Sequence, residues 1–244
     1  MLVCGTGTEV GKTWVCGRLL TELRSRGVAV AARKPAQSFD IDSEGRRLGG
    51  PTDADRLGAA SGELPAAVCH PFRSYRRAMA PPMAAEALGL PPFTVADLME
   101  EMVWPSDRVQ VGVVEMAGGV RSPQASDGDT TDMVTALAPD AVVLVADAGL
   151  GTINGVRLSM DALATATNRL PGTSTVVVLD RYDSHHDIHR RNLAWLSGRN
   201  GYRVVVAPGE ESLLADLVIG GAAPDSAEAR DPPGTVGWGP ISQG

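Results

Sequence analysis

The sequence predicts an α/β fold, in which helices flank a doubly wound, mostly parallel sheet within a single domain. Six short apolar runs rich in valine alternate along the chain with segments of helical periodicity. Runs that are apolar on both faces suit parallel strands covered by helices, because a half-exposed antiparallel strand would alternate apolar and polar residues. The apolar fraction is 43% but only 4% of residues are aromatic, so the core must be built from Val, Leu, Ala and Met, the usual filling of such a sheet.

The predicted elements follow in order along the chain. The strands are residues 2–4, 28–32, 109–114, 141–146, 175–179 and 203–207. The helices are residues 12–26, 53–60, 94–103, 131–138, 156–168, 187–196 and 210–217. Gly27 would end the first helix, and Thr94 with Asp97 three residues later predicts a capped helix start. We expect one domain over residues 1–219, followed by a mobile tail over residues 220–244 whose small and polar residues bury little surface.

Charge and cysteine content narrow the class of function. With 29 acidic and 22 basic residues the formal net charge is −7, which argues against nucleic acid or an anionic membrane as a partner, because both attract basic surfaces. Cys4, Cys16 and Cys69 match no metal-binding spacing, and their odd number leaves one outside any disulfide set. The sequence has no signal-type start and no apolar run of about 18 residues. We therefore expect a cytoplasmic protein that acts on a small molecule.

The strongest functional signal is a glycine-rich loop between the first predicted strand and helix. The loop residues are Gly5, Thr6, Gly7, Thr8, Glu9, Val10, Gly11, Lys12 and Thr13. Such a loop turns its backbone N–H groups inward and continues into a helix N-terminus, which supplies many donors to a triphosphate without side-chain bulk. Lys12 would reach the β- and γ-phosphates, and the Thr13 hydroxyl would bind Mg²⁺. Five residues separate Gly5 from Gly11 where four are usual, so either Thr6 takes the usual glycine position or the loop is one residue longer.

Polar residues that follow the apolar runs are the next candidates, because ligands bind outside the carboxyl ends of the strands in a doubly wound sheet. Lys34 follows the second run and could face the phosphates alongside Lys12. Glu115 follows the third run, and Asp53 opens a helix after a loop. Two carboxylates with the Thr13 hydroxyl would suit Mg²⁺, which prefers oxygen ligands. Each residue also has an ordinary alternative, with Asp53 as a helix cap, Glu115 as a strand-end acid and Lys34 as a solvated lysine.

Five segments together resemble the dethiobiotin synthetase family in order and spacing. They are the loop at 5–13, Lys-Pro-Ala-Gln-Ser at 34–38, Thr-Asp-Ala at 52–54, Val-Glu-Met-Ala-Gly-Gly at 114–119 and Gly-Thr-Ile-Asn at 151–154. The resemblance covers roughly residues 1–220, and a loop with five intervening residues is a feature of that family. It implies ATP-dependent ring closure of 7,8-diaminopelargonic acid with CO₂. A carbamate attacks the γ-phosphate, and the second amine then displaces phosphate.

The resemblance also implies a role for each matching residue. Lys12, Lys34, Thr8 and Ser38 would be catalytic. The nucleotide would be held by Gly7, Thr8, Glu9, Val10, Gly11, Lys12 and Thr13, with Asp180 and Glu210 as further contacts. Mg²⁺ would be bound by Thr13, Asp53 and Glu115. The substrate would be bound by Glu9, Ser38 and Gly118, and by backbone amides of Thr152, Ile153 and Asn154 from the neighbouring subunit of a homodimer. Anion binding by amides at a helix start is sound chemistry in its own right.

Three positions depart from the family pattern. Met116 stands where glycine is usual, which would place a bulky side chain in a turn near the γ-phosphate. Asp180 matches a position where asparagine often contacts adenine, and a carboxylate, which only accepts hydrogen bonds, would favour a base edge with donors such as that of guanine. Asn192 matches the position of a tyrosine that contacts the substrate carboxylate.

Alternative functions stay open at this point. One is a related P-loop ligase that acts on a different substrate. Another is a partitioning-type ATPase switch, although such proteins usually carry an additional lysine early in the loop, and residues 6–9 contain none. A third is a regulatory copy without synthetase activity, which Met116 and Asn192 would allow.

Overall fold

The computed structural model describes residues 1–105 and 109–220. Its centre is a six-stranded sheet with the strand order β10-β9-β8-β1-β5-β2, in which every pair of neighbours is parallel. The strands are β1 (Leu2–Gly5), β2 (Val30–Arg33), β5 (Val111–Glu115), β8 (Ala141–Asp147), β9 (Ser174–Asp180) and β10 (Val204–Val206). The predicted fold class and all six predicted strands are confirmed.

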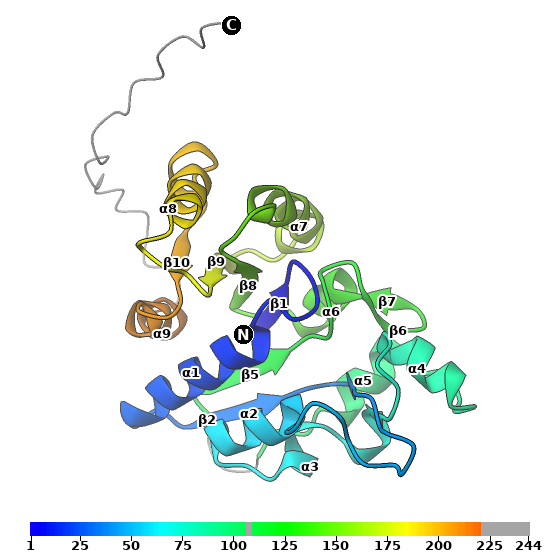
Figure 1. Cartoon of the computed structure of the whole chain (residues 1–244). Helices are drawn as coiled ribbons and strands as arrows, with labels where there is room; N and C mark the ends of the chain where they lie inside the picture. Colours follow the sequence, from blue (N-terminus) through cyan, green and yellow to red (C-terminus); the bar gives the residue numbers. More distant parts are fainter. Residues whose placement is uncertain (106–108, 221–244) are drawn as a thin grey trace, which may run out of the picture.

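Helices cover both faces of the sheet (Figure 1). One face packs against α1 (Lys12–Ser25), α2 (Asp53–Ser61), α3 (Pro65–Val68) and α9 (Glu211–Ile219). The other packs against α4 (Pro81–Ala87), α5 (Val95–Glu101), α6 (Thr130–Leu137), α7 (Thr152–Thr167) and α8 (Asp187–Ala194). Val143 and Val145 point into the first core, whereas Val142 and Leu144 point into the second. This burial on both sides explains why the strands are apolar without alternation.

Short elements complete the described chain. β3 (Gln37–Ser38) pairs in parallel with β4 (Ser74–Tyr75), and β6 (Pro123–Ala125) pairs antiparallel with β7 (Gly128–Asp129). A 3₁₀ turn spans Pro71–Arg73, and a π turn spans Trp195–Arg199. Within the described residues, no helix is long and apolar enough to cross a membrane.

The helix predictions differ from the structure mainly at their ends. The capped start at Thr94 is confirmed, because its hydroxyl accepts from Asp97 N and the Asp97 side chain accepts in return. By contrast, α7 begins at Thr152, four residues before the predicted start at Val156. The helices α3 and α4 were not predicted, because their four and seven residues are too few to show a helical period. Of the predicted tail at 220–244, residues 221–244 lie outside the described residues.

The order of the strands reverses at β1. After β1 the chain passes through α1 to β2, returns to β5 beside β1, and then crosses to β8 on the other side of β1. The loop that follows β1 therefore lies at a switch point, where ligands of such folds bind at the carboxyl ends of the strands. The carboxyl ends of β2 and β5 lie at the same edge of the sheet, which brings Lys34 and Glu115 beside this loop.

Candidate active site

The loop between β1 and α1 turns into the helix through Gly11, where a side chain would be strained. Gly11 is the N-cap of α1 and has φ 97°, and a Cβ there would overlap the carboxylate of Asp180. Thr6 N donates to Val145 O at 2.9 Å, which ties the loop to β8. Lys12 is 7% exposed, and its Nζ donates to Gly7 O at 2.8 Å. The loop is therefore fixed at both ends, with its lysine folded back over it.

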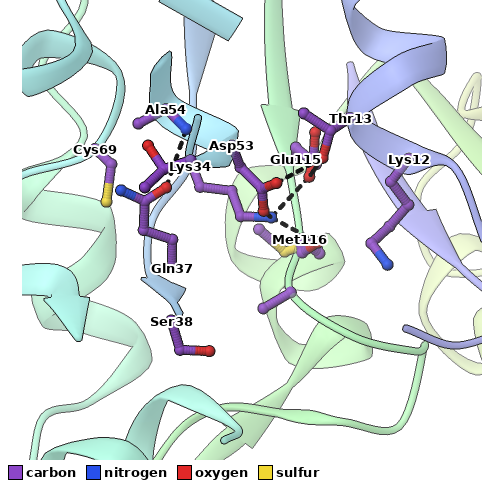
Figure 2. Close-up of polar contacts among 12 residues, drawn as sticks. Lys12, Thr13, Lys34, Gln37, Ser38, Asp53, Ala54, Cys69, Glu115 and Met116 are labelled. Atoms are coloured by element: carbon purple, nitrogen blue, oxygen red, sulfur yellow. Dashed lines mark hydrogen bonds and ion pairs between the residues drawn. The ribbon is translucent and has the colours of Figure 1, made fainter. Parts of the chain in front are cut away.

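An oxygen-rich cluster lies at the first turn of α1. Thr13 Oγ1 lies 2.9 Å from Asp53 Oδ1 and 2.8 Å from Glu115 Oε1, and its single hydroxyl proton can be donated to only one of them at a time. Asp53 is the first residue of α2, and Glu115 is the last residue of β5. Figure 2 shows how these side chains converge from three elements. The predicted metal set of Thr13, Asp53 and Glu115 is thus brought together.

Lys34 joins this cluster. Its Nζ lies 2.8 Å from Asp53 Oδ2 and 2.7 Å from Glu115 Oε1 (Figure 2). Lys34 is 2% exposed and Glu115 is fully buried, so the pair is screened little by solvent. The alternative that Lys34 is a solvated lysine is wrong, because its ammonium is buried between two carboxylates.

The ion pairs shift the pKa values of these groups. Burial alone would lower the pKa of Lys34, but the charges of Glu115 and Asp53 outweigh it and raise the pKa. Lys34 in turn lowers the pKa of Asp53, against the opposing effect of burial. Burial and the nearby Lys34 charge lower the pKa of Lys12. Lys34 is therefore held firmly protonated, and Asp53 is held ionised.

The donor set fits Mg²⁺. Glu115 Oε2 is buried and has no hydrogen-bond partner. A buried oxygen without a partner is energetically costly, so this atom is available to a ligand. Asp53 is not the helix cap, because Thr52 fills that role in a capping box with Asp55. Two carboxylates and a hydroxyl are the hard oxygen ligands that this ion takes.

A buried glutamine positions the start of α2. Gln37 Oε1 accepts from Ala54 N at 3.0 Å, and Gln37 Nε2 donates to Ser74 Oγ at 2.9 Å. These two bonds fix the helix start to the β3–β4 pair, and thereby fix Asp53 next to Thr13. The side chain of Ser38, in the same strand, donates to Met79 O at 2.7 Å.

The cluster forms the floor of a cleft of about 910 Å³. Ten of the predicted site residues line it, namely Thr8, Glu9, Gly11, Lys12, Thr13, Lys34, Ser38, Asp53, Glu115 and Gly118. The lining does not include Gly7, Val10, Thr152, Ile153, Asn154, Asp180 or Glu210. Within one chain, the predicted substrate-carboxylate residues at the start of α7 are thus separate from the cleft.

The expectation for Met116 is corrected. Met116 does not enter the turn near the phosphates, because it is fully buried and packs in the core on the α7 side of the sheet. Asp180 is 4% exposed and its carboxylate lies against Gly11, and its contact with the nucleotide stays a prediction. Burial raises the pKa of Asp180. Glu210 Oε2 accepts from Val206 N at 3.0 Å, so it caps the turn after β10.

Sequence reasoning missed Arg181 as a residue of the cleft. Arg181 lines it, and its guanidinium donates to Glu9 O at 2.7 Å and to Asp147 Oδ2 at 2.9 Å. Its place two residues after the predicted strand at 175–179 was the one available signal. Trp14 and Arg56 also line the cleft, and they come from the exposed faces of α1 and α2.

The start of α7 combines an open helix end with an unpartnered hydroxyl. Thr152 is 8% exposed, and its Oγ1 has no hydrogen-bond partner. Asn192 from α8 donates from Nδ2 to Ala148 O at 2.9 Å and to Gly149 O at 2.8 Å. Asn192 therefore holds the loop before α7 in place.

Comparison with known proteins finds similarity over most of the chain. A family model described as an AAA domain matches residues 1–206. The chain is 36% identical over 225 residues to the ATP-dependent dethiobiotin synthetase BioD of Rhodococcus jostii, covering 91% of this chain and 92% of that protein. It is 33% identical over 234 residues to the protein of the same name from a Caulobacter species, covering 93% and 96%. Among solved structures, the signal recognition particle receptor FtsY from Elizabethkingia anophelis aligns with a TM-score of 0.43 and 15% identity, over 86% of this chain and 58% of that chain.

Proposed function

The chain belongs to the ATP-dependent dethiobiotin synthetase family, and we propose that it closes the cyclic urea of dethiobiotin from 7,8-diaminopelargonic acid, CO₂ and ATP. This would make it a ligase of biotin biosynthesis. The observation that carries the proposal is the meeting of Lys12, Lys34 and the Thr13, Asp53 and Glu115 oxygens in one cleft at the carboxyl ends of the strands.

The chemistry begins with a carbamate formed from one substrate amine and CO₂, with loss of a proton. A carbamate oxygen attacks the γ-phosphorus and ADP leaves, which gives a mixed carbamic–phosphoric anhydride. The second amine attacks the carbamate carbon, and inorganic phosphate leaves as the ring closes. The protein needs to align these groups and to hold cations where the anions meet, because charge repulsion at contact distance is costly in a dry site.

Lys12 supplies one of these cations. Its Nζ contacts Gly7 O at 2.8 Å, and a bound triphosphate would replace that carbonyl as the acceptor. The backbone N–H groups of residues 7–13 then surround the phosphates at the start of α1. Burial and the positive charge of Lys34 lower the pKa of Lys12. A bound anionic ligand would stabilise the protonated form of Lys12.

Thr13, Asp53 and Glu115 would hold Mg²⁺, with the unpartnered Glu115 Oε2 as the best available ligand atom. When bound, the ion supplies positive charge that offsets the charge of the phosphate oxygens. Lys34 then has two possible groups of partners, the carboxylates that it contacts now and the anions of the substrate. We infer that Lys34 moves part of its hydrogen bonding to the carbamate when substrate and metal are present.

The substrate carboxylate would bind at the start of α7, through the amides of Thr152, Ile153 and Asn154. The buried and unpartnered Thr152 Oγ1 supports an anion there, because its hydroxyl can donate to a carboxylate. These residues do not line the cleft of their own chain, which agrees with a homodimer that shares each site between two subunits. Leu150, which is 94% exposed, and Leu158, which is 62% exposed, offer apolar surface beside this helix start for such an interface.

The test is the formation of dethiobiotin and phosphate with and without diaminopelargonic acid and bicarbonate. We expect phosphate release to need both substrates, and Lys12→Ala to lower turnover by at least about 100-fold, as for other groups that stabilise transition-state charge. ATP, GTP and CTP should be compared, because the Asp180 carboxylate only accepts hydrogen bonds and would favour a base edge that carries donors. Phosphate release that ignores both substrates would instead favour an ATPase switch.

A further inference from the structure

The side chain of Arg181 joins the phosphate-binding loop of the nucleotide cleft to the end of β8. Its Nη2 donates to Glu9 O at 2.7 Å, and its Nη1 donates to Asp147 Oδ2 at 2.9 Å. Glu9 lies in the phosphate-binding loop, and Asp147 is the last residue of β8. One guanidinium therefore links the loop that follows β1 to the loop that leads into α7.

The two residues joined by the Arg181–Glu9 hydrogen bond both have a sparsely populated backbone conformation. Glu9 has φ 61° and Arg181 has φ 56°, and the only other non-glycine residue with positive φ in the described chain is Ala138. This region costs roughly 1–2 kcal/mol for a residue with a Cβ, so it persists where the surroundings hold it. The hydrogen bond between Arg181 and Glu9 is one of the contacts that hold both residues in this backbone conformation.

Asp147 extends the link toward α7. Its Oδ1 accepts from Gly149 N at 2.7 Å, so one carboxylate binds both Arg181 and the loop before the helix. Asn192 fixes the carbonyls of Ala148 and Gly149 from the other side. The segment between β8 and Thr152 is thus held by side chains from two directions.

The other end of the phosphate-binding loop lies beside α7. A Cβ placed on Gly155, in the first turn of α7, would lie 3.5 Å from Thr6 Cβ. The helix therefore packs closely against Thr6, while Arg181 connects Glu9 to the loop that precedes the helix. The nucleotide loop and the start of α7 are joined at two places.

We propose that Arg181 is a positioning residue that couples the phosphate-binding loop to the start of α7. This rests on the proposed function, which assigns the start of α7 to the substrate carboxylate in a site shared with the neighbouring subunit. Nucleotide that orders residues 5–13 also orders residues 147–152 through Arg181 and Asp147. Nucleotide bound to one subunit thus prepares the helix end that holds the substrate carboxylate, which makes the two ligands bind cooperatively.

The first test is a double-mutant cycle on nucleotide binding. Calorimetry would measure the Kd of the non-hydrolysable analogue adenylyl imidodiphosphate with Mg²⁺ for Arg181→Met, Asp147→Ala and the double variant. Arg169→Met is the matched control, because Arg169 is exposed and forms no ion pair within residues 1–105 and 109–220. We expect Arg181→Met to weaken binding about three- to fivefold, because its two hydrogen bonds are made by a guanidinium that is 57% exposed. The double variant should be no weaker than Arg181→Met, since the two residues act as one unit.

The second test measures hydrogen exchange at the start of α7 and needs no activity assay. Hydrogen exchange of residues 147–155 should slow when the analogue binds to the wild-type protein, and it should not slow in Arg181→Met at saturating analogue. Equal slowing in the variant, or additive effects in the cycle, would overturn the coupling.

In steady-state kinetics Arg181→Met should raise the KM for diaminopelargonic acid more than it lowers kcat, whereas a general loss of structure would lower kcat and the melting temperature together. If the wild-type protein makes no dethiobiotin, the proposed function fails, while the binding cycle and the exchange data still decide the role of Arg181.

Discussion

Lys34 Nζ lies 2.7 Å from Glu115 Oε1, with 2% of the lysine exposed and the glutamate fully buried. Removing one partner of a buried ion pair leaves the other charge without compensation. We expect Lys34→Met to lower the free energy of unfolding by about 3 kcal/mol, measured by urea denaturation. Millimolar Mg²⁺ should recover part of this loss, because it can neutralise the freed carboxylates of Asp53 and Glu115. An unchanged unfolding midpoint, or one indifferent to Mg²⁺, would contradict the geometry of this site.

The Lys34–Asp53 pair should also make stability depend on acid pH. The pKa of Asp53 is lowered in the folded protein by Lys34, so its contribution is complete above the unfolded value of about 3.9 and is lost as pH falls through the lower folded value. The unfolding midpoint should therefore fall less steeply below about pH 4 in Asp53→Asn than in the wild type. Because the Asp53 side chain is 40% exposed, solvent screening limits the difference. Parallel curves for the two proteins would remove Asp53 from this account.

Gly11 allows a comparison in which only the surroundings differ. Gly11 has φ 97° and Gly27 has φ 76°, but a Cβ at position 11 would overlap Asp180 while a Cβ at position 27 would contact nothing within 4 Å. Gly27→Ala should cost about 1 kcal/mol, from the backbone conformation alone. Gly11→Ala should cost more and should also abolish nucleotide binding, because the loop must shift. Thermal unfolding and analogue titration of both variants measure the difference, and equal costs would mean that Asp180 yields freely.

The sequence could predict the sheet and the meeting of Glu115 with Thr13 because both depend on local pattern and strand order. Apolar runs identify buried parallel strands, and parallel strands bring their carboxyl ends to one edge, which is how Glu115 meets Thr13. Asp53 instead reaches Thr13 from the start of α2, which Gln37 holds in place. The direction of a side chain at a loop was harder to predict. Met116 turns into the core and Asp180 turns under Gly11, because tertiary packing decides which side of a short loop faces the ligand.

The link through Arg181 could not be predicted for a similar reason. Glu9, Asp147 and Arg181 lie at or after the ends of three strands that are far apart in the sequence. Their contacts follow from the adjacency of β1, β8 and β9 and from the conformation of the loops that follow them. No sequence spacing encodes such a contact. A single arginine after a strand is also common on protein surfaces.

The burial of Met116 leads to a prediction opposite to the one its sequence position suggests. The family usually has glycine there, but in this chain Met116 fills part of the core. We expect Met116→Gly to lower the free energy of unfolding by roughly 3 kcal/mol, within the range for truncation of a buried side chain. Met83→Gly is no suitable control, because Met83 lies in α4 where glycine carries its own helix penalty. Met83→Ala, at a position 53% exposed, should change stability by less than about 0.5 kcal/mol. A tolerated Met116→Gly would mean that the core can close around the gap.

The three cysteines report on opening of the fold around the nucleotide site. All three are free and buried, and burial raises the pKa of Cys4 to about 12 and that of Cys69 to about 12. Because the thiolate is the reactive form, iodoacetamide at pH 8 should modify the native protein very slowly and the denatured protein at all three positions. Cys4 lies in β1, next to the phosphate-binding loop, so a bound triphosphate analogue should slow its modification further by stabilising the closed state. Peptide mass spectrometry over time gives the rate at each position, and Lys12→Ala, which should not bind the analogue, is the control. Fast native alkylation of Cys4 that the analogue leaves unchanged would mean that β1 opens independently of the loop that it supports.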